Sequence, residues 1–524
     1  MSSNYDSAQL ISFSISIVYN NCYNFVHLLT HKSNLQLTLP KNRPKNTATV
    51  PKTDIMKPHV IFIPYPQPSA IKSMLKLAEL FHHKGLRVTF VNTEMNHKRF
   101  LESGGPHCLD GSPGFHFITI PDQPTCIVSE VHSGLQLWNK PETKFIDYFY
   151  NLMTSLPNPP TCIISDGLMS SFTIDVAQKL KIPVMLFWAI AACSYMCFYQ
   201  LKSLVEKGIV PLKDTSQETL EKTLDWIPGI KGIRIKDLPS FVWTEPNGRF
   251  FNYLKEATQR SHKVSHNIIY TFDELEGSIV DALSSMFSHV YTVGPMQLLL
   301  DQIPKEEKET EEPNFNGYSL FKEEPECLKW LESKKPNSVI YVSVGSSALL
   351  SREDLIELGW GLANSNHYFL WIIRTDMVLG ESAVLPPEYA DHIKERGFIA
   401  SWCSQEEVLN HGSVGGFLTH CGWSSTIESL TAGVPMICRP VLGDQMTDCR
   451  YTCNEWGVGL EMEGNLKREN VEKLVRELMG ETGQKLRNKA MDWKAKAQIA
   501  TAPNGSSALN VDKLVKEIAM LSST

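Results

Sequence analysis

Short apolar runs alternate with amphipathic stretches along the chain from residue 58 to about residue 295. The apolar runs are rich in β-branched and aromatic residues and predict buried strands: HVIFIPYP, RVTFVNT, HFITIP, TCIISD, PVMLFW, IIYTFDEL and VYTVGP. The stretches SMLKLAELFHHKG and FTIDVAQKLK have helical periodicity, and a glycine closes the first of them. Strands that alternate with helices in this way predict a parallel sheet covered by helices.

A second set of runs with the same alternation follows: SVIYVSVGS, YFLWIIR, GFIASWC, GGFLTH and VPMICRP. The acidic, proline-bearing segment 301–325 separates the two sets, as an interdomain linker does. We therefore predict an α/β protein with two facing doubly wound, Rossmann-like domains, residues 56–300 and 326–500. A C-terminal helix in 501–524 is expected to pack back on the N-terminal domain. Ligands of such sheets bind beyond the carboxyl ends of the strands, so we expect the site in a cleft between the domains.

The first 55 residues have a different pattern. The run LISFSISIVYNNCYNFVHLL contains asparagines and serines that are too polar for a convincing spanning helix. No basic segment precedes it and no small-residue cleavage site follows it, which argues against a signal peptide. Residues 30–55 are polar and contain prolines, which predicts disorder. We interpret residues 1–55 as a disordered or artefactual extension and Met56 as the natural start.

Composition narrows the function classes. The 524 residues are 42% apolar, and 57 acidic residues against 50 basic ones give a net charge of −7 without a basic stripe. This balance argues against a nucleic acid partner. The closest of the twelve cysteines, Cys193 with Cys197 and Cys449 with Cys453, lack histidine partners, so we interpret them as free buried thiols. We expect a cytoplasmic monomer with no bound metal, no cofactor and no stable membrane insertion.

The segment WCSQEEVLNHGSVGGFLTHCGWSSTIESLTAGVPMICRPVLGDQ, residues 402–445, contains the clearest chemistry. Its core predicts a strand, a glycine turn and a helix. Backbone N–H groups at such a helix start bind anions, and His420 adds a donor beside them. On spacing alone, Ser425 and Glu428 also fit a capping box, S-x-x-E, which would be a purely structural role.

Over its whole length and without a gap, this segment resembles the signature of plant secondary-product UDP-dependent glycosyltransferases, family 1. The resemblance implies a GT-B fold whose C-terminal domain binds a UDP-sugar, most often UDP-glucose, as co-substrate. It implies that Trp402 stacks on the uracil, that Glu428 binds the ribose hydroxyls, and that Asp444 and Gln445 bind sugar hydroxyls. No metal is required, because fixed donors can stabilise the departing diphosphate. The other implied contacts of the UDP-sugar are Ser346, Cys403, Gln405, His420, Gly422, Trp423, Ser424 and Ser425.

Three positions depart from the usual signature. Ser404 stands where proline is common, Ser424 where asparagine is usual, and Arg439 where tryptophan is frequent. Other segments, among them WIPGIKGIRIKDLPSF, resemble the branch that glucosylates terpenoid alcohols, steviol among them, and cyanohydrins. The resemblance therefore implies inverting transfer of a sugar to a hydroxyl of a small apolar metabolite. We expect the acceptor near His132, Trp138, Phe187 and Ala189.

The turn PYPQPSAIKS lacks the expected catalytic base. In this family the turn usually reads P-x-P-A-Q-G-H-I-N-P and its histidine deprotonates the acceptor, but Ala70 stands at that position here. The histidine's usual partner is present as Asp166, although an aspartate at a strand end can also cap the next helix. Lys72 is interpreted as a solvated residue at a helix start, and the histidines at 82 and 83 as ordinary helix residues.

Three hypotheses follow from the alanine. In the first, Asp166 takes the acceptor's proton, directly or through a water molecule. In the second, the acceptor is acidic and arrives already ionised. In the third, the chain is a UDP-sugar or small-molecule binding paralogue with impaired catalysis. A general base contributes roughly 10²–10⁴ in rate, so its loss need not abolish transfer.

Overall fold

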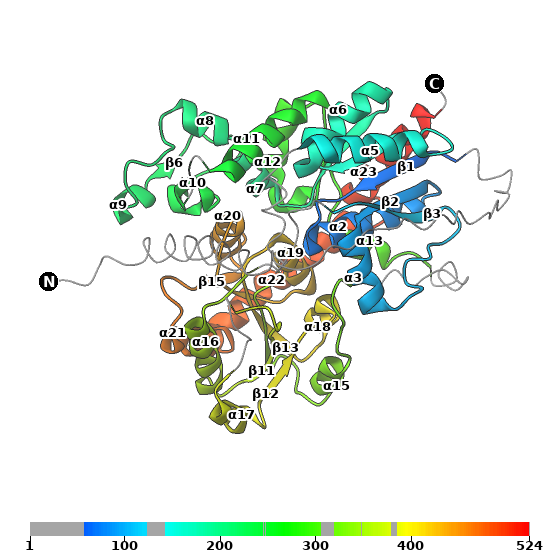
Figure 1. Cartoon of the computed structure of the whole chain (residues 1–524). Helices are drawn as coiled ribbons and strands as arrows, with labels where there is room; N and C mark the ends of the chain where they lie inside the picture. Colours follow the sequence, from blue (N-terminus) through cyan, green and yellow to red (C-terminus); the bar gives the residue numbers. More distant parts are fainter. Residues whose placement is uncertain are drawn as a thin grey trace, which may run out of the picture.

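Two parallel α/β sheets form the body of the protein (Figure 1). In the computed structural model the described residues are 57–122, 142–244, 246, 248–304, 319–346, 348–378 and 385–522. The predicted extension 1–55 and the candidate acceptor residues His132 and Trp138 lie outside them.

The N-terminal sheet has seven parallel strands in the order β3-β2-β1-β4-β5-β8-β9. Every residue of the central strand β1 is buried, as expected for a strand covered by helices on both faces. All the strands predicted before residue 295 are confirmed. Their bounds are β1 His59–Ile63, β2 Arg87–Thr93, β3 Phe115–Ile120, β4 Cys162–Asp166, β5 Val184–Trp188, β8 His266–Ile269 and β9 His289–Thr292.

Helix α2 follows β1 directly and begins at Pro68, whose missing N–H costs nothing in a first turn. The short hairpin β6 Thr223–Leu224 with β7 Ile233–Arg234 is antiparallel. The helices of this half are α2 Pro68–His83, α3 Glu94–Gly104, α5 Glu142–Ser155, the 3₁₀ turn η3 Gly167–Met169, α6 Ser170–Leu180, α7 Ala192–Tyr199, α8 Leu201–Glu206, α9 Gln217–Leu220, α10 Phe241–Thr244, α11 Arg249–Gln259, α12 Asp273–Met286 and α13 Met296–Leu300.

The C-terminal sheet has six parallel strands in the order β12-β11-β10-β13-β14-β15. The five predicted runs are confirmed as β10 Val339–Ser343, β11 Tyr368–Ile372, β12 Gly397–Ala400, β13 Val414–Thr419 and β14 Met436–Cys438. The edge strand β15, Gly459–Glu461, was not predicted, because its three residues, GLE, are too few to show a period.

The helices of the C-terminal half, except the last one, cover both faces of its sheet (Figure 1). They are α15 Glu326–Glu332, α16 Arg352–Asn364, α17 Pro387–Ile393, α18 Gln405–Asn410, α19 Trp423–Ala432, α20 Gln445–Arg450, the π-helical turn Tyr451–Glu455, α21 Arg468–Leu478, α22 Glu481–Thr501 and α23 Ser506–Leu521.

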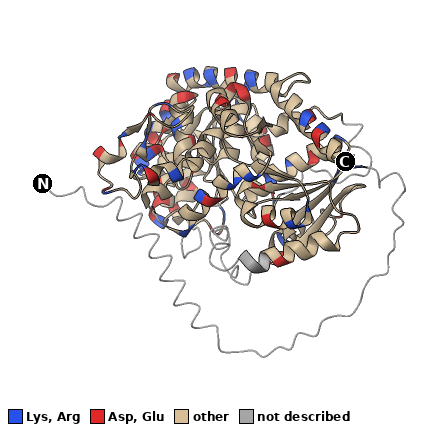
Figure 2. Ribbon diagram, turned by 90° about the horizontal axis from the view of Figure 1, so that it is seen from above, with Lys and Arg blue, Asp and Glu red and all other residues tan. Residues whose placement is uncertain are grey.

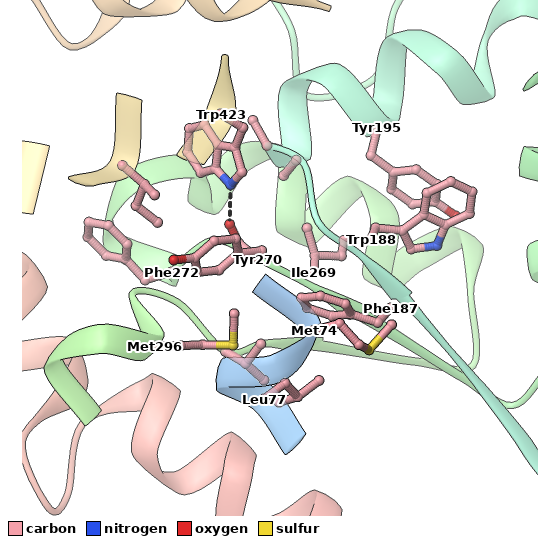
Figure 3. Close-up of a cluster of buried hydrophobic side chains, with 14 of the residues drawn as sticks. Met74, Leu77, Phe187, Trp188, Tyr195, Ile269, Tyr270, Phe272, Met296 and Trp423 are labelled. Atoms are coloured by element: carbon pink, nitrogen blue, oxygen red, sulfur yellow. Dashed lines mark hydrogen bonds between the residues drawn. The ribbon is translucent and has the colours of Figure 1, made fainter. Parts of the chain in front are cut away.

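Buried side chains join the two halves. The indole N–H of Trp423, at the start of α19, donates to the backbone carbonyl of Tyr270 at 2.6 Å (Figure 3). A second indole, that of Trp456, donates to the carbonyl of Leu275 at 3.3 Å. A buried indole needs a partner for its N–H, so these two bonds fix how the sheets sit relative to each other. One continuous apolar core includes side chains of both halves.

The last helix, α23, lies against the N-terminal sheet (Figure 1). The Asn510 amide donates to the carbonyl of Thr292 at 3.0 Å. Glu517 accepts the hydroxyl of Tyr291 at 2.8 Å and lies 2.9 Å from the imidazole of His266. Leu514 on the same helix is fully buried in the shared core.

Acidic and basic residues are interspersed over both halves rather than gathered by sign (Figure 2). Within the described residues, every helix is too short or too polar to cross a lipid bilayer.

The packing of α23 gives a stability prediction. Leu514→Ala should lower the free energy of unfolding by about 2–5 kcal/mol, since it leaves a cavity in the shared core. Leu509→Ala is the matched control on the same helix, because Leu509 is 50% exposed, and it should change that free energy by less than about 0.5 kcal/mol. Urea-induced unfolding of the full chain measures both. Equal losses from the two variants would show that α23 is not part of the core.

Candidate functional site

Two loops at the carboxyl edge of the C-terminal sheet meet around His420. Because β10 and β13 are paired in parallel, with Ser343 opposite Thr419, the residues that follow them lie side by side. The His420 ring fits between two glycines. A Cβ on Gly345 would lie 2.3 Å from the ring's Cε1, and a Cβ on Gly422 would lie 2.5 Å from its Nε2. Neither glycine can therefore gain a side chain without moving the imidazole.

The imidazole of His420 is neutral at physiological pH. Burial, helped by the nearby Arg374, lowers its pKa to about 4. Its Nδ1 is buried and has no hydrogen-bond partner among the described residues. A neutral imidazole keeps one N–H to donate.

Helix α19 begins directly beside this ring. Its N-cap is Gly422, and no side chain caps the first turn. The first backbone N–H groups of α19 therefore lack the partners that a side-chain cap would supply. Together with the N–H of His420 and the neighbouring Ser346, they make a site suited to an anion such as a phosphate.

The capping box predicted from spacing is wrong. Ser425 and Glu428 lie within α19, after its first residue Trp423, so neither can cap the start. Both instead accept hydrogen bonds from the Gln405 amide, at 3.1 Å to the Ser425 hydroxyl and 2.7 Å to the Glu428 carboxylate. Gln405 thereby joins the start of α18 to α19.

Two candidate donor-site residues, Trp402 and Cys403, lie in the loop between β12 and α18. The half-buried Trp402 packs against Phe321 with ring centroids 4.4 Å apart. Cys403 is buried, with its thiol 3.5 Å from the Tyr341 hydroxyl.

The loop after β14 ends in Asp444 and Gln445. The side-chain oxygen of Gln445 accepts the backbone N–H groups of Val441 and Leu442 at 2.9 and 3.0 Å, which shapes the loop. Burial raises the pKa of the Asp444 carboxyl to about 6. Gly443 exchanges hydrogen bonds with Ser240 of the N-terminal half, so this loop also lies at the contact between the two halves.

The structure thus brings the candidate donor-site residues to one edge of one sheet. Trp402, Cys403 and Gln405 follow β12, Ser346 follows β10, and Asp444 and Gln445 follow β14. The group His420, Gly422, Trp423, Ser424, Ser425 and Glu428 follows β13. Trp423 is the exception in orientation, because its only donor is used toward Tyr270 of the other half.

Comparison with known proteins agrees with this geometry. Residues 321–492 match the family model described as UDP-glucoronosyl and UDP-glucosyl transferase. The chain is 62% identical over 472 residues to UDP-glycosyltransferase 85C2 of Stevia rebaudiana, covering 89% of this chain and 98% of that protein. The chain belongs to the plant family 1 UDP-glycosyltransferases.

Other relatives and solved structures agree. The (R)-mandelonitrile beta-glucosyltransferase of Prunus dulcis and the 7-deoxyloganetin glucosyltransferase of Gardenia jasminoides are each 47% identical, over 88% of this chain and 97% of theirs. The structure of Os79 from O. sativa in complex with UDP matches with a TM-score of 0.74 at 26% identity, covering 88% of this chain and all of that one. The predicted GT-B fold is confirmed.

On the acceptor side of this glycosyltransferase, Asp166 ends β4 beside the end of β1. Its carboxylate accepts the backbone N–H of Leu168 at 2.9 Å and that of Tyr65, so it caps the 3₁₀ turn η3. Burial raises its pKa to about 7 against these two bonds. Asp166 therefore has the capping role that its place at a strand end allowed. Its carboxyl group also has a pKa near neutrality, at the end of the central strands.

Ala70 lies in the first turn of α2. Its methyl group is buried in an apolar cluster with Tyr65 and Met169, and Ala189 packs against the same cluster. Phe187, by contrast, is fully buried in the main core beside Met74 and Tyr270 (Figure 3), so the expectation that it lines an acceptor pocket is not met here.

Sequence reasoning missed Asn92. This residue is 1% exposed, and neither its amide nitrogen nor its amide oxygen has a partner among the described residues. It lines a small cavity beside the turn PYPQPSAIKS, together with Pro64, Ile71 and Met169. A buried, unpartnered amide is costly, so this position suits a ligand hydroxyl or a water molecule. An asparagine at a predicted strand end was the available signal.

Sequence reasoning also missed Arg374. Its guanidinium donates to the backbone carbonyls of Gly345 and Ala348 and lies 3.0 Å from Asp376, which shapes the loop that contains Ser346. The signal was an arginine placed directly after the apolar run YFLWII. Arg439, one of the three departures, has a buried Nε without a partner in the described part of the chain.

Cysteines far apart in sequence meet behind the His420 turn. The sulfur atoms of Cys421, Cys438 and Cys449 lie within 4.8 Å of one another, all buried, and the thiols of Cys438 and Cys449 contribute to raising the pKa of Cys453. All ten described cysteines are free thiols. The sequence paired Cys449 only with Cys453. The fold brings Cys421 and Cys438 beside them, which spacing along the chain could not show.

The side chain of Lys72 is 41% exposed to solvent, as expected for a helix start, but the sequence did not predict its partners. Its ammonium pairs with Glu406 and Glu428 of the other half. The histidines of the same helix have local partners: His82 faces Leu86 and Ser112, and His83 pairs with Glu79.

The packing of His420 predicts how glycine changes affect UDP binding. Gly345→Ala should weaken UDP binding by about tenfold or more, because the added methyl group displaces the His420 ring, the donor expected at the diphosphate. Gly412→Ala is the control, since a Cβ there meets no atom within 4 Å. Isothermal titration with UDP measures both. Unchanged UDP affinity in Gly345→Ala would contradict the assigned phosphate site.

Proposed function

We propose that this enzyme transfers glucose from UDP-glucose to a hydroxyl of a small apolar plant metabolite, a terpenoid alcohol, with inversion at the anomeric carbon. The observation that supports the donor most directly is the convergence of His420, the uncapped start of α19 and Ser346. The relative named for 7-deoxyloganetin supports a terpenoid acceptor, and the relative named for (R)-mandelonitrile, a cyanohydrin, supports only the wider class of small apolar hydroxyl compounds. Ten free thiols among the described residues support a reducing, cytoplasmic location.

On the donor side, each residue type fits its partner chemically. Trp402 offers an aromatic face to the uracil, and Glu428 with Gln405 accepts and donates hydrogen bonds at the ribose. Asp444 and Gln445 face the sugar hydroxyls. The N–H of His420 and the amides of α19 stabilise the charge that develops on the diphosphate as the sugar leaves. These fixed donors act without reorganising during the reaction.

On the acceptor side, Asp166 is the proton acceptor in our proposal. The acceptor oxygen forms a bond to C1 of the glucose, the bond from C1 to the diphosphate oxygen breaks, and UDP leaves with that electron pair. The acceptor's proton passes to the Asp166 carboxylate, directly or through a water molecule. A pKa of about 7 supports this role, because a general base works best when its pKa lies near the working pH.

The absence of an imidazole at position 70 limits the rate rather than the reaction type. Orientation of two bound reactants contributes on the order of 7–11 kcal/mol to lowering the barrier, more than the roughly 3–5.5 kcal/mol of a general base. An acidic acceptor that binds ionised would need no base at all. A binding paralogue without catalysis is the remaining alternative, and it gives no reason for Asp444 and Gln445, the residues proposed for the transferred sugar.

A product assay tests the proposal. The full chain is incubated with UDP-glucose and panels of terpenoid alcohols, phenols and carboxylic acids, and glucosides are measured by mass spectrometry. We expect glucosides of alcohols from the natural chain, formed faster by Ala70→His, which adds the imidazole usual in the family beside Asp166. Products from acids alone would favour the ionised-acceptor alternative. Product from Ala70→His but none from the natural chain would overturn the proposal in favour of a binding paralogue.

The pKa of Asp166 gives a pH prediction. For an alcohol acceptor, kcat/KM should rise with pH through about 7 and then level off, because only the carboxylate takes a proton. Asp166→Asn should lower kcat/KM by about 10²-fold or more and remove this rise. An unchanged pH profile in Asp166→Asn would exclude Asp166 as the base.

The same group gives a second readout in stability. The native carboxyl keeps its proton up to a pH of about 7, whereas the unfolded one has a pKa near 3.8. Asp166 therefore favours the folded state below pH 3.8 and loses this contribution as pH rises through about 7. Asp166→Asn should flatten the dependence of stability on pH in that window, measured by urea unfolding at several pH values.

A further inference from the structure

Two lysines on one face of α2 reach across to the C-terminal half. Lys72 and Lys76 are one helical turn apart. The Lys72 ammonium lies 3.0 Å from the Glu406 carboxylate and 3.2 Å from the Glu428 carboxylate. The Lys76 ammonium pairs with Glu406. Helix α2 is the helix whose first turn contains Ala70, so these ion pairs join the acceptor turn to α18 and α19.

The carboxylate of Glu428 depends on this contact electrostatically. Its side chain is only 6% exposed, and Glu406 lies beside it. Burial and Glu406 both raise the pKa of Glu428, whereas Lys72 and Lys76 lower it. For Lys72, burial alone would lower the pKa of the ammonium, but the two carboxylates outweigh burial and raise it. Lys72 is therefore charged, and it is the cation in direct contact with Glu428.

The surroundings of Lys72 contain further acidic groups. Glu323, before α15, and the hydroxyl of Tyr270 also interact electrostatically with Lys72. The Lys72 side chain is 41% exposed, whereas the side chains of Lys76 and Glu428 are 10% and 6% exposed. The ammonium of Lys72 thus lies where the buried end of Glu428 meets solvent-accessible space.

We propose that Lys72 is a positioning residue of the UDP-sugar site, supplied by the acceptor half, that holds the Glu428 carboxylate in place for the ribose hydroxyls. This rests on the proposed assignment of Glu428 to the ribose. Gln405 fixes one oxygen of Glu428 at 2.7 Å, and Lys72 fixes the other at 3.2 Å. A carboxylate held at both oxygens presents its remaining lone pairs in one direction.

The same contact links the two substrates. A ribose bound at Glu428 and the turn that contains Ala70 are then connected through one side chain. Filling the donor site would therefore fix the first turn of α2 against α19, which places the acceptor turn for transfer. Lys76 also joins the halves, but within the described residues its ammonium pairs with Glu406 and makes no ion pair with Glu428. A Lys76 variant therefore tests docking of the halves separately from positioning of Glu428.

Binding of UDP and of its 2′,3′-dideoxy analogue tests the role of Lys72. In the natural chain we expect UDP to bind about tenfold or more tightly than the analogue, because the analogue lacks both ribose hydroxyls. Lys72→Met should weaken UDP binding and largely remove this preference, and Lys72→Arg should restore part of it. Lys76→Met should keep the preference even if it lowers the unfolding temperature. Isothermal titration of the full chain gives all the affinities.

The outcomes separate the two claims. If the natural chain prefers UDP but Lys72→Met keeps that preference, the role of Lys72 is wrong and the ribose site at Glu428 stands. If Lys76→Met loses the preference as fully as Lys72→Met, the lysines only dock the halves and the proposal is overturned. If the natural chain binds UDP and the analogue equally, the assignment of Glu428 to the ribose fails, and the inference fails with it.

Discussion

The hydrogen bond from the Trp423 indole to the Tyr270 carbonyl connects the two functional edges of this enzyme. Trp423 is the first residue of α19, whose N–H groups form the expected phosphate site, and Tyr270 follows strand β8 of the acceptor half. Both residues are buried in one shared core. The carboxyl edges of the two sheets are consequently held in register by a contact that water does not weaken.

A tight fit of backbone around one ring determines the donor site. His420 occupies the space that side chains at Gly345 and Gly422 would need, and Arg374 holds the first of these loops by its carbonyls. The parallel pairing of β10 with β13 makes this arrangement possible, because the two strands end side by side and their glycine-containing loops begin next to each other. The neutral state of His420 follows from its burial, and it suits a donor more than a base.

The acceptor side shows how an enzyme of this family can differ at its most characteristic position. Ala70 leaves only a methyl group in an apolar cluster, while Asp166 remains buried at the neighbouring strand end with a raised pKa. Asn92 adds an unpartnered amide nearby. The pKa of this carboxylate is set by its environment rather than by its residue type, which is why we propose it as the proton acceptor.

The sequence by itself determined the architecture and indicated the candidate donor residues. Apolar runs of strand length, separated by amphipathic helices, predict two parallel sheets because burial on both faces imposes that pattern. The gapless segment 402–445 placed the donor residues after their strands, and Ala70 was visible without any structure. A three-residue strand such as β15 has too little pattern to detect.

The tertiary structure decided what depends on partners distant in the chain. Ser425 and Glu428 have the spacing of a capping box, yet both accept hydrogen bonds from Gln405. Glu428 also accepts one from Lys72, 356 residues away in the chain. The Trp423 indole donates to Tyr270 of the other half, and Phe187 packs in the core. The thiol of Cys421 lies beside those of Cys438 and Cys449. Periodicity reports only which face of an element is buried. The identity of the side chain that meets that face is fixed when the two sheets pack together.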